Sequence, residues 1–324
     1  MNLLEVNHLK TYFPVKKGVF GKTVAHVHAV DDVTFSLKEG ESLGLVGESG
    51  CGKSTLGRTI IQLEKPTSGD VIFEGKRIND LDFESLKKVR SKIQMIFQDP
   101  FSCLDPRMSI EKIITEPLRL HNQGDKASRR STAVSLLGKV GLPESSLNRY
   151  PHEFSGGQRQ RIGIARALAL RPKLIIADEP VAALDVSVQA QVLNLLNDIK
   201  KEFGLTVIFI SHDLGVIKYF CDKIAVMYLG KVVEIAGSDE IYQHQVHPYT
   251  RALFSAIPVP DPTLVKERIV LQGDVPSPMA PPSGCRFHTR CPHVKDQCKT
   301  TEPPLVELKP GHHVACHFSS TFLK

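Results

Sequence analysis

The chain has 324 residues, of which 41% are hydrophobic and 23% are charged, and its formal net charge is +6. These values are ordinary for a globular protein with a full core, and they exclude disordered and collagen-like classes. The longest apolar stretches are strand-sized, well short of the ~18 residues that a membrane-spanning helix needs. The charge favours anionic ligands only mildly, and no basic block with interleaved aromatic residues predicts nucleic-acid binding. Because the N-terminus lacks the basic and apolar regions of a secretory signal, we expect a cytosolic protein.

The chain alternates between short apolar runs rich in branched residues and segments with helical periodicity. This pattern is typical of βα units that form a largely parallel sheet, so the sequence predicts an α/β fold. We expect strands at residues 42–47, 92–97, 173–178, 205–211 and 223–228. Between two of these strands, an apolar helical face predicts a helix that ends at Gly204. The residues of this face are Val188, Val192, Leu195 and Ile199.

Two other regions depart from this pattern. Residues from about 100 to 170 contain no strand-like run, and we expect a helical insertion there. From Pro248 onward lie 12 of the 21 prolines. Because proline interrupts long helices and central strands, we expect residues 241–324 to form a small, loop-rich domain. Something other than a large core should hold that domain together.

The stretch GESGCGKST, residues 47–55, follows a predicted strand and opens a predicted helix. In such a phosphate-binding loop, glycines let backbone N–H groups turn toward nucleotide phosphates. Lys53 should reach the β- and γ-phosphates, and Ser54 should ligate Mg²⁺. Leu56, Ile60 and Leu63 should share one face of the helix that follows. The expected nucleotide-binding residues are Gly47, Glu48, Ser49, Gly50, Cys51, Gly52, Lys53, Ser54 and Thr55.

Cys51 lies inside this loop, at the N-terminus of the predicted helix, where the pKa of a thiol tends to fall. We therefore expect a thiol whose modification blocks ATP hydrolysis. A small, tolerated side chain explains the presence of cysteine at this position equally well.

The apolar run LIIADE, residues 174–179, ends in two carboxylates. Asp178 at the strand tip is placed to hold Mg²⁺ through water, and Glu179 is placed to polarise a water for attack on the γ-phosphate. The alternative is that both carboxylates simply lie at a solvated strand end. A phosphate-binding loop in the same chain favours the functional interpretation.

The stretch EFSGGQRQRIGIARALA, residues 153–169, resembles the signature of ATP-binding cassette ATPases. The order along the chain is also similar to that family, with Gln98 in the Q-loop position, AALD at 182–185 and His212 in SHD. The resemblance covers residues 1–240, with the helical subdomain at about 100–170. It implies a P-loop NTPase fold, with a RecA-like core, an antiparallel β layer near the N-terminus and a helical subdomain that carries the signature.

The resemblance also implies a site shared by two cassettes that close face to face. One face would place Lys53 and His212 at the γ-phosphate, with Glu179 as the catalytic carboxylate. Magnesium would be surrounded by Ser54, Gln98 and Asp178, and Gln98 would also serve the catalytic site. The partner would supply its own signature residues, and Asp185 would link the two faces. The signature residues are Ser155, Gly156, Gly157 and Gln158.

An aromatic residue near the N-terminus should stack on the adenine. TYFP offers Tyr12 and Phe13, of which we favour Phe13, although both could instead be core residues. Phe154 and Ala182 depart from the commonest family residues, leucine and serine. Neither change removes a charged or catalytic group, so we predict an active enzyme.

The segment HPYTRALFSAIP, residues 247–258, resembles the C-terminal domain of dipeptide and oligopeptide permease ATPases. Pro248 also suits the first position of a short helix. The stretches VGESGCGKSTLGR, FQDPFSCLDPRMSI and PVKKGVFG are similar to the same group. This resemblance implies an importer ATPase at the cytoplasmic face of the membrane. Its partners would be a second, related ATPase, two membrane permease subunits docking near Gln98 and residues 100–120 and, indirectly, a substrate-binding protein.

Other function classes remain open at this stage. Relatives of such importers move nickel or antimicrobial peptides. Soluble cassette ATPases act in DNA repair or translation, but they usually carry two cassettes or long insertions that this chain lacks. A redox or metal sensor that uses the cassette as a scaffold would rest on the cysteines alone.

Four of the seven cysteines lie in the last 40 residues: Cys285, Cys291, Cys298 and Cys316. In a reducing cytosol they are poor candidates for disulfides. Their spacings lack the C-x-x-C pattern of common zinc ribbons, and four thiolates suit either Zn²⁺ or an iron–sulfur cluster, so the residues alone leave zinc, cluster and free thiols open. The resembled family implies a [4Fe–4S] cluster. Five histidines could substitute in a zinc site, but we expect them to be bystanders: His288, His293, His312, His313 and His317.

Overall fold

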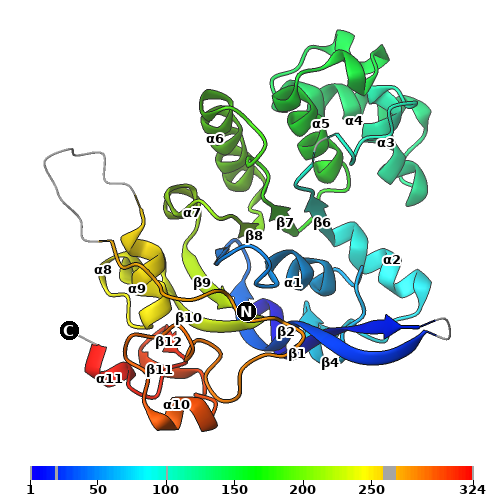
Figure 1. Cartoon of the computed structure of the whole chain (residues 1–324). Coiled ribbons are helices and arrows are strands. Elements are labelled where there is room, and N and C mark those ends of the chain that lie inside the picture. Colours follow the sequence, from blue (N-terminus) through cyan, green and yellow to red (C-terminus); the bar gives the residue numbers. More distant parts are fainter. Residues whose placement is uncertain (1, 19–20, 100, 258–267, 323–324) are drawn as a thin grey trace, which may run out of the picture. The chain divides into compact units, whose positions relative to one another are not determined.

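The computed structural model describes residues 2–18, 21–99, 101–257 and 268–322, which form two compact units (Figure 1). The P-loop unit comprises residues 2–37, 42–79 and 212–324, and the helical unit comprises residues 38–41 and 80–211. Within the described residues, no helix combines the length and apolar character needed to cross a membrane.

The P-loop unit contains an antiparallel sheet in the strand order β2-β1-β4-β5. Its strands are β1 (Asn2–Lys17), β2 (Lys22–Lys38), β4 (Ser68–Phe73) and β5 (Lys76–Arg77). Leu4 of β1 lies opposite Phe73 of β4, and Val6 lies opposite Val71. All four side chains are buried, so one face of this sheet contributes to the core. The antiparallel layer expected near the N-terminus is present.

A second set of strands in the same unit begins with β3 (Ser42–Val46), which is parallel to β9 (Lys223–Tyr228). The next strand, β10 (Lys231–Gly237), is antiparallel to β9. Four helices belong here: α1 (Lys53–Ile60), α7 (Leu214–Phe220), α8 (Ser238–Gln243) and α9 (Pro248–Ser255). On α7, the side chain of Ile217 occupies the space beside Gly44, so this helix packs directly on β3.

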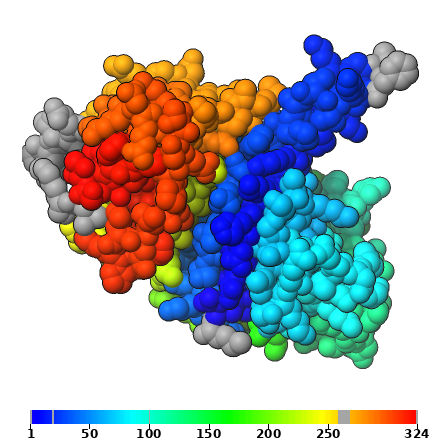
Figure 2. Space-filling model, turned by 90° about the horizontal axis from the view of Figure 1, so that it is seen from below, coloured from blue at the N-terminus to red at the C-terminus, as the bar shows by residue number. Residues whose placement is uncertain are grey.

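The C-terminal tail, residues 268–322, contains more regular structure than its prolines predict. Strand β12 (His312–Val314) pairs with β10 and with β11 (Val306–Lys309), and so extends the sheet. Two short helices complete the tail, α10 (Asp296–Thr300) and α11 (Ser319–Phe322). The rest of the described tail is loop, as expected. On the face in Figure 2, the orange part of the tail runs beside the blue N-terminal strands, where the His28 N–H donates to the Pro278 carbonyl (3.0 Å).

The helical unit is built around three parallel strands in the order β6-β7-β8. These are β6 (Ile93–Ile96), β7 (Leu174–Asp178) and β8 (Thr206–Ile210), joined by α2 (Phe83–Lys92) and α6 (Val186–Phe203) to their neighbours in the chain. The insertion is helical, as predicted. It consists of α3 (Ile110–Leu120), α4 (Lys126–Lys139), η1 (Glu144–Asn148), η2 (Pro151–Glu153) and α5 (Gly156–Leu168). Figure 1 places α3, α4 and α5 together.

All five predicted strands are confirmed, but the predicted helical faces need correction. Leu56 and Ile60 are buried on α1, whereas Leu63 is 49% exposed. The helix ends at Ile60, and the chain turns at Gln62 with a φ of 59°, which takes Leu63 off the apolar face.

The helix α6 ends at Gly204 in a left-handed C-cap, as predicted. Its buried residues are Val192, Leu193, Leu196 and Ile199. Val188 and Leu195 are only half-buried, because the buried stripe is centred slightly to one side of the predicted one. Register along a helix of this length is set by the surface against which it packs, which periodicity alone does not specify.

Candidate functional site

The glycine-rich loop connects β3 to α1, so the predicted strand, loop and helix are all present. Two of its glycines are required by close backbone contacts. A Cβ at Gly47 would lie 2.2 Å from the Met227 carbonyl oxygen, and one at Gly52 would lie 1.9 Å from the Ala29 carbonyl oxygen. Gly52, with a φ of 105°, also adopts a conformation that other residues rarely reach. The surrounding strands therefore fix the path of the loop.

Lys53 is held inside this loop. Its Nζ donates hydrogen bonds to the carbonyl oxygens of Gly47 (2.8 Å) and Glu48 (3.1 Å). The side chain is buried, so its ammonium places a positive charge, little screened by water, at the N-terminus of α1. A helix N-terminus and a neighbouring cation together favour anionic phosphate oxygens.

The pKa of the Cys51 thiol does not fall as expected. Cys51 is buried, and this burial raises the pKa of its thiol although Lys53 acts in the opposite direction. Loss of solvation disfavours the thiolate more than the neighbouring lysine favours it. The effect of thiol modification on ATP hydrolysis stays a prediction.

In the helical unit, Gln98 and Glu179 lie together. The Gln98 Nε2 donates to the Glu179 Oε2 (2.9 Å). Glu179 follows β7 with a φ of 44°, and its N–H donates to the Ile210 carbonyl of β8 (3.0 Å). A glutamate in this sparsely populated conformation is typical of a functional site. Asp178, one residue earlier, is buried at the end of β7.

The signature stretch forms the start of α5. Ser155 is the N-cap, its Oγ accepting from the Gln158 N–H (3.4 Å), while the Gln158 Oε1 accepts from the Ser155 N–H (3.0 Å). This reciprocal cap fixes the helix start, whose first-turn N–H groups lack intrahelical acceptors. A Cβ at Gly157 would lie 2.4 Å from the Val188 Cγ1 of α6, so Gly157 is required by packing.

The remaining predicted residues are distributed over both units. His212 follows β8 closely in sequence and lies in the P-loop unit, while Asp185 stands at the N-cap of α6. Tyr12 is engaged elsewhere, since its ring lies 4.1 Å from the His28 ring and its hydroxyl donates to Asp31 (2.5 Å). Phe13 is half-buried, and its role at the adenine stays a prediction.

The four tail cysteines line one pocket, together with aromatic residues that include Phe287 and Phe318. No pattern in the sequence indicates that these aromatic residues line the pocket with the cysteines. Burial raises the pKa of the Cys285 thiol to about 11, and burial also raises the pKa of Cys291 and Cys316. Among the described residues, no three His, Cys, Asp or Glu side chains meet in the geometry of a single-ion site.

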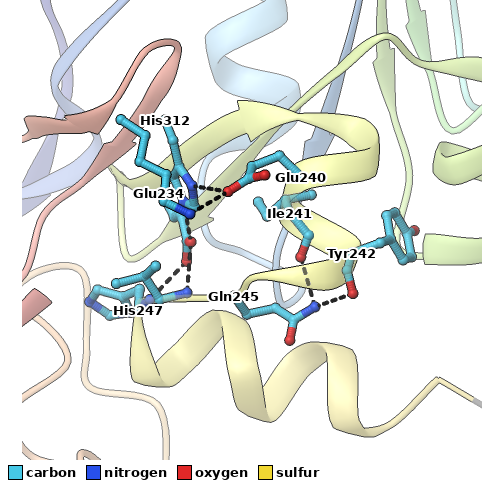
Figure 3. A network of polar contacts seen from close by, with 9 residues as sticks. Glu234, Glu240, Ile241, Tyr242, Gln245, His247 and His312 are labelled. Atoms are coloured by element: carbon cyan, nitrogen blue, oxygen red, sulfur yellow. Dashed lines mark hydrogen bonds and ion pairs between the residues drawn. The ribbon is translucent and has the colours of Figure 1, made fainter. Parts of the chain in front are cut away.

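A buried glutamate anchors the tail and the HPYT segment. Glu234 of β10 accepts hydrogen bonds from the backbone N–H groups of Val246 and His247 (both 2.9 Å), and it pairs with the His312 Nε2 (2.8 Å). Figure 3 shows this network, in which His312 also faces Glu240 (3.4 Å). His247 in turn caps α9, and Pro248 is its first residue, as predicted. The sequence did not indicate the central role of Glu234.

Two families match this chain. Residues 30–182 match the ABC transporter family, and residues 233–298 match the family described as oligopeptide/dipeptide transporter, C-terminal region. The oligopeptide transport ATP-binding protein AppF of Bacillus subtilis is 55% identical over 321 residues, which cover 98% of each chain. The chain belongs to the oligopeptide and dipeptide branch of the ABC transporter ATP-binding proteins.

Other relatives agree with this assignment. A putative peptide import ATP-binding protein of Brucella ovis is 54% identical over 90% of this chain and 92% of its own length. Among solved structures, a dimeric ATP-binding cassette in a post-hydrolysis state with ADP and Pi matches with a TM-score of 0.65. It is 32% identical and covers 72% of this chain and 98% of its own. The expected P-loop NTPase fold is therefore confirmed.

Proposed function

We propose that this chain is the ATP-hydrolysing subunit of an ABC importer for dipeptides or oligopeptides. The main support is its 55% identity, over 98% of both chains, to an oligopeptide transport ATP-binding protein. Such a subunit is peripheral, bound at the cytoplasmic face of the membrane to permease subunits that carry the peptide. The match of residues 233–298 to a peptide-transporter region argues against a DNA-repair or translation ATPase.

The proposed chemistry divides between phosphate binding and water activation. In the P-loop unit, the loop N–H groups and Lys53 bind the β- and γ-phosphates, and His212 senses the γ-phosphate. In the helical unit, Glu179 polarises the attacking water, and its hydrogen bond from Gln98 orients the carboxylate. A carboxylate held in one rotamer offers the water a fixed acceptor.

Magnesium fits the oxygen donors that these motifs supply. Ser54 offers a hydroxyl, Asp178 a carboxylate and Gln98 an amide oxygen, a donor set that suits Mg²⁺. The Gln98 amide nitrogen donates to Glu179, so the amide oxygen would be the donor that Gln98 offers to the ion. When bound, the ion neutralises charge on the phosphate oxygens.

Each ATP is proposed to lie between two cassettes. The N–H groups at the start of α5, around Gly156 and Gly157, would bind the γ-phosphate held by the partner. Asp185 would contribute a contact across that interface. The dimeric state of the solved cassette that matches this chain supports the arrangement. We infer that the partner is a second, related ATPase subunit.

The docking surface for the permease subunits is proposed to lie near Gln98 and residues 100–120. Phe101 is 58% exposed there, and its ring lies 4.1 Å from the Arg159 guanidinium. An exposed aromatic ring fixed by a cation suits an apolar partner helix. A substrate-binding protein would act only through the permease subunits.

The tail cysteines are proposed to hold a [4Fe–4S] cluster. All four line one pocket, and thiolates are the donors that such clusters take. Zinc is the alternative, since it also takes four thiolate donors. His312 pairs with Glu234, and the His317 Nε2 bonds the Thr301 carbonyl (2.9 Å), which supports their role as bystanders.

The test is Glu179→Gln in the complex reconstituted with its permease subunits and partner ATPase. We expect ATP hydrolysis and peptide uptake to fall by about 100-fold or more, with MgATP still bound. Glu144→Gln is the matched control, because Glu144 lies in the same unit, outside the motifs of the site, and pairs with Arg130 (3.5 Å). Unchanged hydrolysis in Glu179→Gln would refute the assigned role, and a wild-type complex with no peptide-stimulated hydrolysis would refute the function.

A further inference from the structure

Glu48, the second residue of the phosphate-binding loop, is held by two residues of the C-terminal region. The Tyr249 hydroxyl accepts a hydrogen bond from the Glu48 backbone N–H (2.9 Å). The Arg290 Nη1 donates to the Glu48 Oε2 (2.8 Å). Tyr249 lies on α9 in the HPYT segment, and Arg290 directly precedes Cys291, so two separate segments meet at one residue of the loop.

These contacts are largely shielded from water. Tyr249 is fully buried, the Arg290 side chain is 9% exposed and the Glu48 side chain is 31% exposed. Burial raises the pKa of the Tyr249 hydroxyl, which therefore stays neutral. Unlike an exposed ion pair, such a contact is costly to break, because the partner that remains is poorly solvated.

Aromatic packing fixes the position of Tyr249. Its ring lies 4.7 Å from the Tyr228 ring and 5.5 Å from the Phe287 ring, and Tyr228 and Phe287 meet edge to face at 5.2 Å. Tyr228 ends β9, and the preceding residue, Met227, is the one whose carbonyl lies against Gly47. The packing of these three rings therefore holds the Tyr249 hydroxyl in place beside the phosphate-binding loop.

The third polar group of Glu48, its carbonyl oxygen, accepts from the Lys53 Nζ (3.1 Å). The N–H, carboxylate and carbonyl of this one residue thus connect Tyr249 and Arg290 with the lysine that binds phosphate. We propose that Tyr249 and Arg290 are positioning residues that set the conformation of the phosphate-binding loop, so that nucleotide affinity depends on the C-terminal region. The inference rests on nucleotide binding by this loop, as proposed above.

Simple attachment of the tail does not need these two contacts. Elsewhere the tail is anchored by the buried ion pair between Arg286 and Asp31, by Lys231 with Glu302 and by Glu234 with His312. The Arg286 pair involves no residue of the phosphate-binding loop. It is the matched control, since its arginine is as buried as Arg290, each 9% exposed, and it also joins the tail to an earlier part of the same unit.

The experiment measures MgATP affinity of the full-length chain, purified without oxygen, by titration with a fluorescent ATP analogue. We expect Tyr249→Phe, which keeps the ring, to weaken binding about threefold to tenfold, as for the loss of one hydrogen bond. Arg290→Met should weaken it about tenfold or more, and Arg290→Lys should restore part of the loss. The combination of Glu48→Gln with Arg290→Met should be no weaker than Arg290→Met alone, because both changes break one contact.

Arg286→Met should lower the melting temperature as much as Arg290→Met does, yet leave MgATP affinity within about twofold of wild type. Unchanged affinity in both Tyr249→Phe and Arg290→Met would overturn the inference. An equal loss of affinity in Arg286→Met would overturn it too, because the effect would then belong to tail attachment in general. Failure of Lys53→Ala to weaken binding would instead refute the proposed nucleotide site.

Discussion

The side chains of Gln98 and Glu179, 81 residues apart in the chain, are joined by a 2.9 Å hydrogen bond from the Gln98 Nε2 to the Glu179 Oε2. Glu179 is also held through its backbone N–H by the Ile210 carbonyl. The backbone of Glu179 is therefore held by the neighbouring strand β8, and its carboxylate is held by the loop that follows β6. Any conformational change that moves Gln98 would release one of these two restraints.

Gln98→Glu should lower ATP hydrolysis of the complex by about tenfold or more while leaving MgATP affinity within about threefold. The change replaces a donor with a second carboxylate at hydrogen-bond distance from Glu179, and two such charges repel each other. Steady-state hydrolysis and equilibrium nucleotide binding are the two measurements. Gln94→Glu is the control, because it makes the same charge change on β6, the strand before Gln98, where the Gln94 side chain bonds the Arg90 carbonyl. Equal activity in the two variants would contradict this role for Gln98.

Much of the site follows from local patterns. The β-branched run before Asp178 specifies a buried strand, and the glycines of residues 47–55 specify a turn that other residues cannot make. Both patterns act over a few residues, where sterics and burial decide the outcome. The predicted strand, loop and helix around Lys53, Glu179 and the signature residues are therefore present. The roles of these residues stay predictions.

Other features depend on contacts between distant residues. The partners of Glu48 are 201 and 242 residues away, and the Glu234–His312 pair spans 78 residues. The hydrophobic periodicity of a segment does not predict contacts between residues this far apart in the chain. The error at Cys51 has a related cause, because the helix N-terminus is visible in sequence whereas the burial that outweighs it is a tertiary property.

Gly157→Ala should destabilise the helical unit by about 1 to 3 kcal/mol, because the new Cβ would overlap Val188. Hydrolysis should fall as well, since α5 must move at the residues expected to meet a phosphate. Thermal unfolding and ATP hydrolysis of the complex are the measurements.

The control for this change is Gly138→Ala, in the last turn of α4 with open space around it, which should not destabilise the helical unit. Adding Val188→Ala to Gly157→Ala should recover the lost stability. If the melting temperature stayed low in that double variant, steric overlap with Val188 would not be the cause.

The Glu234–His312 pair should make stability depend on pH. Burial acts to lower the pKa of His312, but its hydrogen bonds and charge interactions with Glu234 and Glu240 outweigh burial and raise it. A raised pKa in the folded state contributes stability below the ordinary value of about 6.5, and this contribution is lost as pH rises through the raised pKa. Each unit of pKa difference corresponds to about 1.4 kcal/mol.

Melting temperatures between pH 6.5 and 8.5 test this prediction. Burial lowers the pKa of the nearby His247 to about 4, so His247 stays neutral in the folded protein over this range. Wild type should lose stability across the interval, and His312→Gln should lose less. His26→Gln, outside this network, should follow wild type. Parallel curves for wild type and His312→Gln would mean that the pair is not charged.

The tail pocket predicts about four iron and four sulfide per chain after purification without oxygen, as a [4Fe–4S] cluster requires. Cys298→Ser should abolish most of the iron, because this buried residue is one of the four cysteines that line the pocket and are proposed as ligands. It should also lower the melting temperature, since the segments that carry the cysteines would lose the link that the proposed cluster provides. Cys103→Ser is the control, because Cys103 lies in the helical unit and should leave the iron content unchanged.

One zinc and no iron per chain would exclude the cluster, although a metal would still link the cysteines. If neither metal were found, the pocket would be an aromatic core that contains free thiols.

The same samples can separate effects on stability from effects on nucleotide binding. The tail keeps the Arg286–Asp31 and Glu234–His312 pairs without the cluster, so Cys298→Ser should lower the melting temperature of the tail more than it lowers MgATP affinity. A large loss of affinity at an unchanged melting temperature would reverse that order, and would mean that the cysteines act on the loop through Arg290 and not on the stability of the tail.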